Sequence, residues 1–301
     1  MQIRTLDLEF FRTGTIAAYL VESGGDLALI ETGPDSTFPS LVAALARHGV
    51  KPSDVRTVLV THIHLDHAGA AWRMAREGAT VRVHPRGAAH LLDPSKLLAS
   101  ARRIYRERMD GLWGTLEPIP ADRLEVTGDG QAIPVGKTAI HVLETPGHAV
   151  HHNAYLVEGV AFTGDVGGVA IGGGPVLPPT PPPDIDLAAW SRSIERIRAA
   201  RPDALYPTHF GRVENPDEAL DGLGRELSAW ADFVRAGLAA GKDEAALVPE
   251  FEEWLEGRLV VAGVPAEGRE AYRTALPFAM NVGGLVRYWQ KAGTLLESSA
   301  P

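Results

Sequence analysis

The chain has 301 residues, of which 45% are hydrophobic, and a formal net charge of −9 at pH 7. This length can hold one large domain or two modest ones, and the apolar content is enough to fill a core. The negative charge argues against a surface for nucleic acids or anionic membranes. Because cysteine is absent, there are no disulfides, no thiolate metal ligands and no cysteine nucleophile.

The sequence also lacks the signals of a membrane or exported protein. No stretch approaches the roughly 18 apolar residues of a membrane span. The N-terminal segment MQIRTLDLEFFRTG has neither the basic leader nor the apolar run of a signal peptide. We therefore expect a cytoplasmic protein with no membrane or nucleic-acid partner.

Strands and helices alternate in the first third of the chain. Residues 16–23 and 26–32 are short apolar runs around a Gly-Gly turn, which is typical of a hairpin. Apolar residues at helical spacing predict a helix over 38–50, and the β-branched run 55–62 is typical of a strand buried on both faces. The next predicted elements are a helix over 68–78, a strand over 80–85 and an inserted amphipathic helix over 95–111.

The middle of the chain repeats this alternation. The predicted elements are strands over 138–145, 153–159, 160–165 and 204–209 and a helix over 187–200. Residues 172–186 are too rich in glycine and proline for regular structure, a composition typical of a disordered linker. A rigid loop at the rim of a site is the alternative. We predict the latter, with 175–183 lining the entrance, because proline restricts φ and lowers the entropy lost on ordering.

The pattern from Asn215 onward is helical. Its apolar face consists of Leu220, Leu223, Leu227, Trp230, Val234 and Leu238. Such a face must be buried against a partner, and the rest of the chain is the nearest one. We therefore divide the chain into a main domain, residues 1–214, and a helical C-terminal region, residues 215–301, packed on it.

Three histidines and an aspartate lie within six residues of the motif THIHLDH, a pattern that rarely arises by chance. In an extended stretch, residues two apart point to the same side, so His62 and His64 can share a site. If the chain then turns into a helix, Asp66 and His67 are carried toward a second position nearby. The pattern indicates a metal site.

Three more candidate ligands lie where predicted strands run out into turns. They are His148 in TPGH, Asp165 in FTGD and His209 in PTH, each next to a proline or glycine that fixes the backbone. Imidazole and carboxylate ligands suit zinc, iron or manganese. Seven such groups are too many for one tetrahedral ion and about right for two ions that share a carboxylate.

The motifs THIHLDH, TPGH, FTGD and PTHFG, in this order within residues 14–212, resemble those of the metallo-β-lactamase superfamily. The resemblance implies an α/β fold, the αββα sandwich, with two metal ions at one edge; the C-terminal helices lie outside it. By motif position, one ion would be held by His62, His64 and His148, the other by Asp66, His67 and His209, with Asp165 bridging them. His152 would be an outer hydrogen-bonding partner of the ligands.

Two positions depart from the family pattern. Glu31 stands where an aspartate is common, and we expect it to alter the surroundings of the ligands without being one. His64 stands where oxygen-reducing diiron relatives carry a carboxylate, which disfavours that branch. The other histidines (His48, His84, His90, His141 and His151) are interpreted as structural or solvated. A further group, consisting of Arg102, Arg103, Tyr105 and Arg106, could bind an acidic group, but a solvated helix face is favoured.

The resemblance and the ligand set predict a metal-dependent hydrolase. A metal-bound hydroxide would attack a small-molecule ester, thioester, lactone or amide, and Asp66 would orient the nucleophile or protonate the leaving group. The expected cofactors are two divalent ions, zinc first, with manganese or iron as alternatives. The expected partner is a small-molecule substrate, and a homo-oligomer stays open. The alternatives are a nucleic-acid phosphodiesterase, a mononuclear-iron sulfur oxygenase and a non-catalytic metal-binding module.

Overall fold

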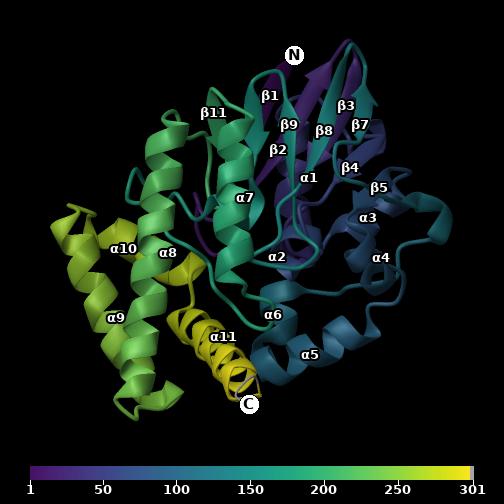
Figure 1. The fold of residues 1–301 in the computed structure, drawn as a ribbon. Coiled ribbons are helices and arrows are strands. Elements are labelled where there is room, and N and C mark those ends of the chain that lie inside the picture. The colour runs from purple at the N-terminus through teal and green to yellow at the C-terminus, as the bar shows by residue number, and fades with distance from the viewer. Residues whose placement is uncertain (299–301) are drawn as a thin grey trace.

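Two β-sheets packed face to face, with helices on both outer sides, form the core of the protein (Figure 1). The computed structural model describes residues 1–298. The first sheet has six strands in the order β1-β2-β3-β4-β5-β6, and the second has five in the order β11-β10-β9-β8-β7. The fold is thus the predicted αββα sandwich with a helical C-terminal extension.

Both sheets are mixed. The strands of the first sheet are β1 (Gln2–Asp7), β2 (Ala17–Ser23), β3 (Asp26–Ile30), β4 (Thr57–Leu59), β5 (Thr80–Val83) and β6 (Leu124–Val126). The strands of the second sheet are β7 (Ala132–Val135), β8 (Thr138–Glu144), β9 (Asn153–Val157), β10 (Val160–Phe162) and β11 (Ala204–Tyr206). Strands β3 to β6 run parallel to one another, and β11 runs parallel to β10, so their carboxyl ends meet at common edges.

The helices fall into two sets. Those before the second sheet are α1 (Phe38–Ala46), α2 (Leu65–Ala68), α3 (Ala71–Arg76), α4 (Pro85–Leu92), α5 (Ser95–Tyr105) and α6 (Met109–Trp113). Helix α7 (Leu187–Ala199) lies between β10 and β11, and α8 (Pro216–Ala239), α9 (Glu244–Val261), α10 (Ala266–Ala275) and α11 (Phe278–Ser298) follow the second sheet. No helix among residues 1–298 is long and apolar enough to cross a membrane.

Three apolar layers hold the sandwich together. In β2, alternate residues point to opposite faces: Tyr19 and Val21 pack between the two sheets, while Leu20 packs under the helices of the first half. The second sheet is covered by α7 and the C-terminal helices, whose apolar face includes the buried Trp230. Apolar packing covers both faces of both sheets. A functional site is therefore expected where the polar strand ends meet at one edge of the sandwich.

The sequence expectations hold for the order of these elements and fail at several boundaries. The strand predicted over 55–62 is only Thr57–Leu59, because the residues after it turn to present the histidine motif. The helix predicted over 68–78 is shorter, Ala71–Arg76, and follows the one-turn helix α2, and the one predicted over 95–111 ends at Tyr105. Strands β1, β6 and β7 were not predicted.

The C-terminal helix α11 packs closely on the proline-rich loop, residues 172–186. Thr180 donates its backbone N–H to the Oδ1 of Asn281 and its hydroxyl to the carbonyl oxygen of Asn281. At Gly284, one turn on, an added Cβ would lie only 1.9 Å from the carbonyl oxygen of Thr180. A glycine is therefore what allows the helix and the loop to approach this closely.

We expect Gly284→Ala to lower the free energy of unfolding by about 1–3 kcal/mol, because the added methyl group forces two backbones apart. The matched control is Gly293→Ala on the same helix, where a Cβ meets nothing within 4 Å. The control should be neutral or stabilising by up to about 1 kcal/mol, since alanine favours helix. Equal denaturant midpoints for the two variants would contradict the packing described here.

Candidate metal centre

The predicted ligands meet at one edge of the sandwich, where the strands of both sheets end. The segment after β4 carries His62 to His67, with Asp66 and His67 on the short helix α2. His148 follows β8, Asp165 lies in a 3-10 turn (Gly164–Gly167) after β10, and His209 follows β11. All seven residues that the sequence singled out are thus brought together.

One group of donors consists of His62, His64 and His148. The Nδ1 of His64 lies 2.9 Å from the Nε2 of His62 and 3.0 Å from the Nε2 of His148. The donor atoms of the three residues all lie within 4.8 Å of one another. Three nitrogens therefore converge on one point, as the ligands of a single ion do.

A second group consists of Asp66, His67 and His209, again with donor atoms within 4.8 Å of one another. The Oδ2 of Asp66 lies 3.7 Å from the Nε2 of His67 and 3.5 Å from the Nε2 of His209. Burial alone would raise the pKa of Asp66, but the two neighbouring imidazoles outweigh it and lower the pKa to about 2. This group therefore carries a carboxylate charge across the ordinary pH range.

Asp165 lies between the two groups and contacts both. Its Oδ2 lies 3.3 Å from the Nε2 of His148, whereas its Oδ1 lies 3.2 Å from the Nε2 of His67. Its turn is held close by Gly164, where a Cβ would lie 2.7 Å from the Oγ1 of Thr61. The two oxygens of one carboxylate thus face different groups of donors.

Hydrogen bonds on the outer side fix the orientation of the imidazoles. The Nδ1 of His148 donates to the carbonyl oxygen of Pro179 at 2.8 Å, and the Nδ1 of His209 donates to the carbonyl oxygen of Thr15 at 2.8 Å. The Nδ1 of His62 lies 3.0 Å from the hydroxyl of Thr61. Their Nε2 atoms are left facing the centre, which is the arrangement typical of histidine metal ligands.

Glu31 is the outer partner of His67. This fully buried side chain follows β3, and its Oε1 accepts a hydrogen bond from the Nδ1 of His67 at 3.1 Å. The hydroxyls of Thr61 and Thr208 also donate to Glu31. The sequence expectation that Glu31 acts on the surroundings of the ligands, without being one, agrees with these contacts.

The donor set fits divalent cations. Burial alone would lower the pKa of His67, but three nearby carboxylates raise it well above the usual value. The Nε2 of His67 and the Oδ1 of Asp165 are buried, and although they lie 3.2 Å apart, neither forms a well-aligned hydrogen bond in the described part of the chain. Leaving such atoms buried without a partner is unfavourable, and a positive ion would satisfy both. Nitrogen and oxygen donors without sulfur suit zinc, manganese or iron.

His152 lies behind the donors and is fully buried. Its Nδ1 bonds the hydroxyl of Thr145 at 2.8 Å, and its Nε2 accepts from the backbone N–H of Val166 at 3.5 Å. Its ring packs against that of His62 at 5.1 Å between centroids. These contacts fix the turn that carries Asp165, so His152 acts on the backbone beside a candidate ligand and makes no hydrogen bond to the ligands themselves.

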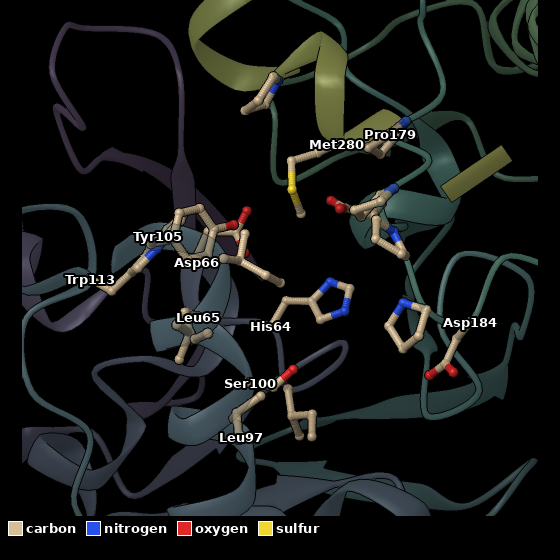
Figure 2. A pocket seen from close by; sticks show the side chains of 18 of the residues that line it. His64, Leu65, Asp66, Leu97, Ser100, Tyr105, Trp113, Pro179, Asp184 and Met280 are labelled. Atoms are coloured by element: carbon tan, nitrogen blue, oxygen red, sulfur yellow. The ribbon is translucent and has the colours of Figure 1, made fainter. Parts of the chain in front are cut away.

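A cavity of about 380 Å³ opens onto the donors and is lined mainly by apolar side chains. Figure 2 shows His64 and Asp66 facing it, with Leu65, Tyr105 and Trp113 on one side and Pro179 and Asp184 on another. The walls come from α5 and α6, from the proline-rich loop and from α10 and α11. The loop therefore lines the entrance, as predicted, and the linker interpretation is wrong.

Four of the residues interpreted as structural or solvated lie in or near the cavity wall or cap a helix. Tyr105 is turned into the cavity, so the interpretation as part of a solvated helix face is wrong for it; His90 and His151 also line the cavity, and their interpretation as structural or solvated stays a prediction. His151 is buried, with its ring 5.9 Å from that of His64. His84 is structural: its Nδ1 accepts from the backbone N–H of Arg86 and caps α4. The sequence signal for the placement of His151 near the candidate ligands is its position three residues after His148.

The remaining surface interpretations hold. His48 and His141 are exposed, and so are Arg102, Arg103 and Arg106. The helix α5 therefore turns its arginines to solvent and its apolar side toward the cavity, which is the usual arrangement of an amphipathic helix.

Comparison with known proteins gives the family. The chain matches the model of the metallo-beta-lactamase superfamily over residues 12–209, well over half of its length. The chain belongs to this superfamily. The match contains all seven predicted ligands and ends where the C-terminal region begins.

Among sequence relatives, a metallo-beta-lactamase fold-containing protein of Sulfurisphaera tokodaii is 30% identical over 161 residues, 52% of this chain and 60% of that protein. The atrochrysone carboxyl ACP thioesterase of Aspergillus fumigatus is 28% identical over 206 residues, 67% of this chain and 53% of that protein. The chain thus spans only 53–60% of the length of these relatives.

The fold of the whole chain is shared with a solved structure. A metallo-beta-lactamase family protein of Thermus thermophilus superimposes with a TM-score of 0.69 and 23% identity, covering 97% of this chain and 94% of that one. Since the superposition extends over nearly the whole chain, the C-terminal helices belong to the shared fold.

We expect Glu31→Gln to weaken divalent-ion binding to the group that contains His67 by about 10–100-fold, because the outer carboxylate orients that imidazole and increases its basicity. Competition with a chelator, followed by metal analysis, measures this. The control Glu22→Gln removes a partly exposed carboxylate of β2 and should change nothing. Loss of both ions, or of neither, in Glu31→Gln would contradict this role.

Proposed function

We propose that the protein is a hydrolase that uses two divalent metal ions, zinc first, to cleave a small-molecule ester, thioester, lactone or amide. The observation that carries this proposal is the convergence of seven imidazole and carboxylate side chains on two adjoining points. In the proposal, His62, His64 and His148 hold one ion, Asp66, His67 and His209 hold the other, and Asp165 bridges them. Bound ions would supply an acidified water as nucleophile and a Lewis acid for the substrate carbonyl.

The position of the Asp165 carboxylate between the two groups of donors favours two bound ions over one. A carboxylate that served a single ion would turn both oxygens to one group of donors, whereas its Oδ1 and Oδ2 face different groups. Three carboxylates, Glu31, Asp66 and Asp165, also lie in or beside the cluster. Two divalent ions offset this charge better than one. A mononuclear-iron oxygenase has no use for the group of Asp66, His67 and His209.

Two side chains of the cavity wall are placed to act on the substrate. Asp66 is the most exposed carboxylate of the cluster, with 24% of its side chain accessible. As a carboxylate it can orient the attacking water, or accept a proton from that water and pass it to the leaving group. Tyr105 lies beside it (Figure 2), and burial, followed by the charge of Asp66, raises the pKa of its phenol. Tyr105 therefore stays protonated and can donate a hydrogen bond to the substrate.

The apolar walls support a substrate with a hydrocarbon or aromatic acyl part. Leu97, Ala101 and Ile104 follow one another along the side of α5 that faces the cavity, and Met280 faces it from α11. Ile104 is 45% exposed and therefore offers apolar surface to a ligand in the cavity. The similarity to a carboxyl ACP thioesterase favours a thioester among the four substrate classes.

Metal analysis of two variants tests the centre. We expect two ions per chain in the wild type, a loss at both positions in Asp165→Ala, and a loss of mainly one ion in His209→Ala. The reason is that a bridging carboxylate serves both ions, whereas a terminal imidazole serves one. Equal losses of one ion in the two variants would show that Asp165 does not bridge. A single iron per wild-type chain would favour the oxygenase.

A substrate panel tests the reaction. Chromogenic esters, thioesters, lactones, β-lactams and phosphodiesters should be assayed with defined metals, and turnover is expected with the carbonyl substrates. Tyr105→Phe should lower kcat/KM by about 10–100-fold without loss of metal, because it removes one donor to the reacting group. The control Tyr288→Phe alters a tyrosine that does not line the cavity. Turnover of phosphodiesters alone would overturn the proposed reaction.

A further inference from the structure

One side of the cavity is cationic. Helix α4 contributes Arg86 and His90, and helix α5 contributes Lys96 and Ser100. Each pair is four residues apart, so both members lie on the same face of their helix. We call these four residues the cationic wall.

The charges of this wall are available to a ligand. Arg86 and Lys96 are exposed, and neither forms an ion pair with another side chain in residues 1–298. Asp93, the acidic residue close to Lys96 in sequence, accepts a hydrogen bond from the N–H of Ser95 and lies within electrostatic reach of Lys96 without forming an ion pair with it. Outside the metal centre, the one acidic residue that lines the described cavity is Asp184, which comes from the proline-rich loop (Figure 2).

The wall also lies close to the metal centre. Between Arg86 and His90, Gly87 allows α4 to pack against the segment of the histidine motif: a Cβ there would lie 2.7 Å from a methyl group of Ile63 and 3.7 Å from the Cβ of His151. His151 in turn packs against His64 at 5.9 Å between ring centroids. A single ligand can therefore reach both the donors and the wall.

We propose that the cationic wall binds an anionic group, a carboxylate or a phosphate, on the substrate of the metal centre. The inference rests on the proposed hydrolysis and narrows its substrate class to acyl compounds with an apolar body and a negative charge away from the scissile bond. Arg86 and Lys96 hold the charge, and the apolar side of α5 covers the body. The guanidinium of Arg86 and the ammonium of Lys96 both line this side of the cavity, and each of these groups binds carboxylates and phosphates.

The kinetic test compares two esters of the same chain length, p-nitrophenyl hexanoate and the mono-p-nitrophenyl ester of adipate, with the metal-loaded full chain. The measured quantity is the ratio of kcat/KM for the anionic ester to that for the neutral one. Arg86→Ala and Lys96→Ala should each lower this ratio about 3–10-fold, the range of one charge-assisted contact. Asp184→Asn should raise it, since it removes the opposing charge.

The binding test uses octyl phosphate and octan-1-ol with the same protein, followed by calorimetry. The preference for the phosphate over the alcohol, as the ratio of their affinities, should fall in Arg86→Ala and Lys96→Ala, and also in 0.5 M salt because exposed charges are screened. Any contact of the phosphate with the metals is common to all variants and cancels in the comparison. The matched control is Arg103→Ala, an exposed arginine of α5 that does not line the cavity.

The outcomes separate this inference from the proposed function. If neither ester is hydrolysed at any metal loading, the proposed hydrolysis is wrong and the binding ratio alone decides the anion site. If Arg86→Ala and Lys96→Ala match Arg103→Ala in both ratios, with metal content and thermal stability equal to wild type, the cationic wall does not bind the anion. A response to octyl phosphate but not to the adipate ester would assign the wall to phosphate.

Discussion

Each imidazole has two ring nitrogens. In His67, His148 and His209, a hydrogen-bond acceptor holds one of the two nitrogens, so that the other faces a common centre. Fully buried rings cannot rotate to water to satisfy themselves, so an acceptor on the outer side sets both tautomer and direction. Here the acceptors are Glu31 and the carbonyl oxygens of Thr15 and Pro179. In His64 the Nδ1, and not the Nε2, faces the centre. The geometry of the metal centre depends on these outer bonds.

The outer bonds connect parts of the chain that are far apart in sequence. Thr15 precedes β2 of the first sheet yet holds His209 of the second, so the centre joins the two sheets. Pro179 holds His148, and the next residue, Thr180, is bonded to Asn281 of α11. The residue that orients His148 is thus next in sequence to a residue that α11 holds. The packing of the C-terminal helices is therefore linked to the orientation of a candidate ligand. Loosening their packing should disturb the chemistry before it unfolds the sandwich.

The clustering of the candidate ligands could be predicted from the sequence because each one sits in a short motif at the end of an apolar run. Their outer partners could not, because a backbone carbonyl oxygen such as that of Thr15 leaves no signature in residue type. Glu31 stood out only as a departure from the pattern. The fold class followed from the resemblance of the motifs to the metallo-β-lactamase superfamily. The ends of strands were predicted less well: β4 stops at Leu59, because tertiary contacts, and not β-branched residues, decide where pairing ends.

Substrate choice lies in segments that carry no motif. The outer walls of the cavity come from α4, from the insertion around α5, from the proline-rich loop and from α10 and α11, none of which supplies a candidate metal ligand. Tyr105 resembles its neighbours Arg103 and Arg106 in sequence context, yet α5 turns it inward and them outward. In the proposed function, the donors at the strand ends determine the type of reaction, and the helix faces around the cavity determine which substrates can bind. A family match over residues 12–209 therefore identifies the chemistry more sharply than the substrate.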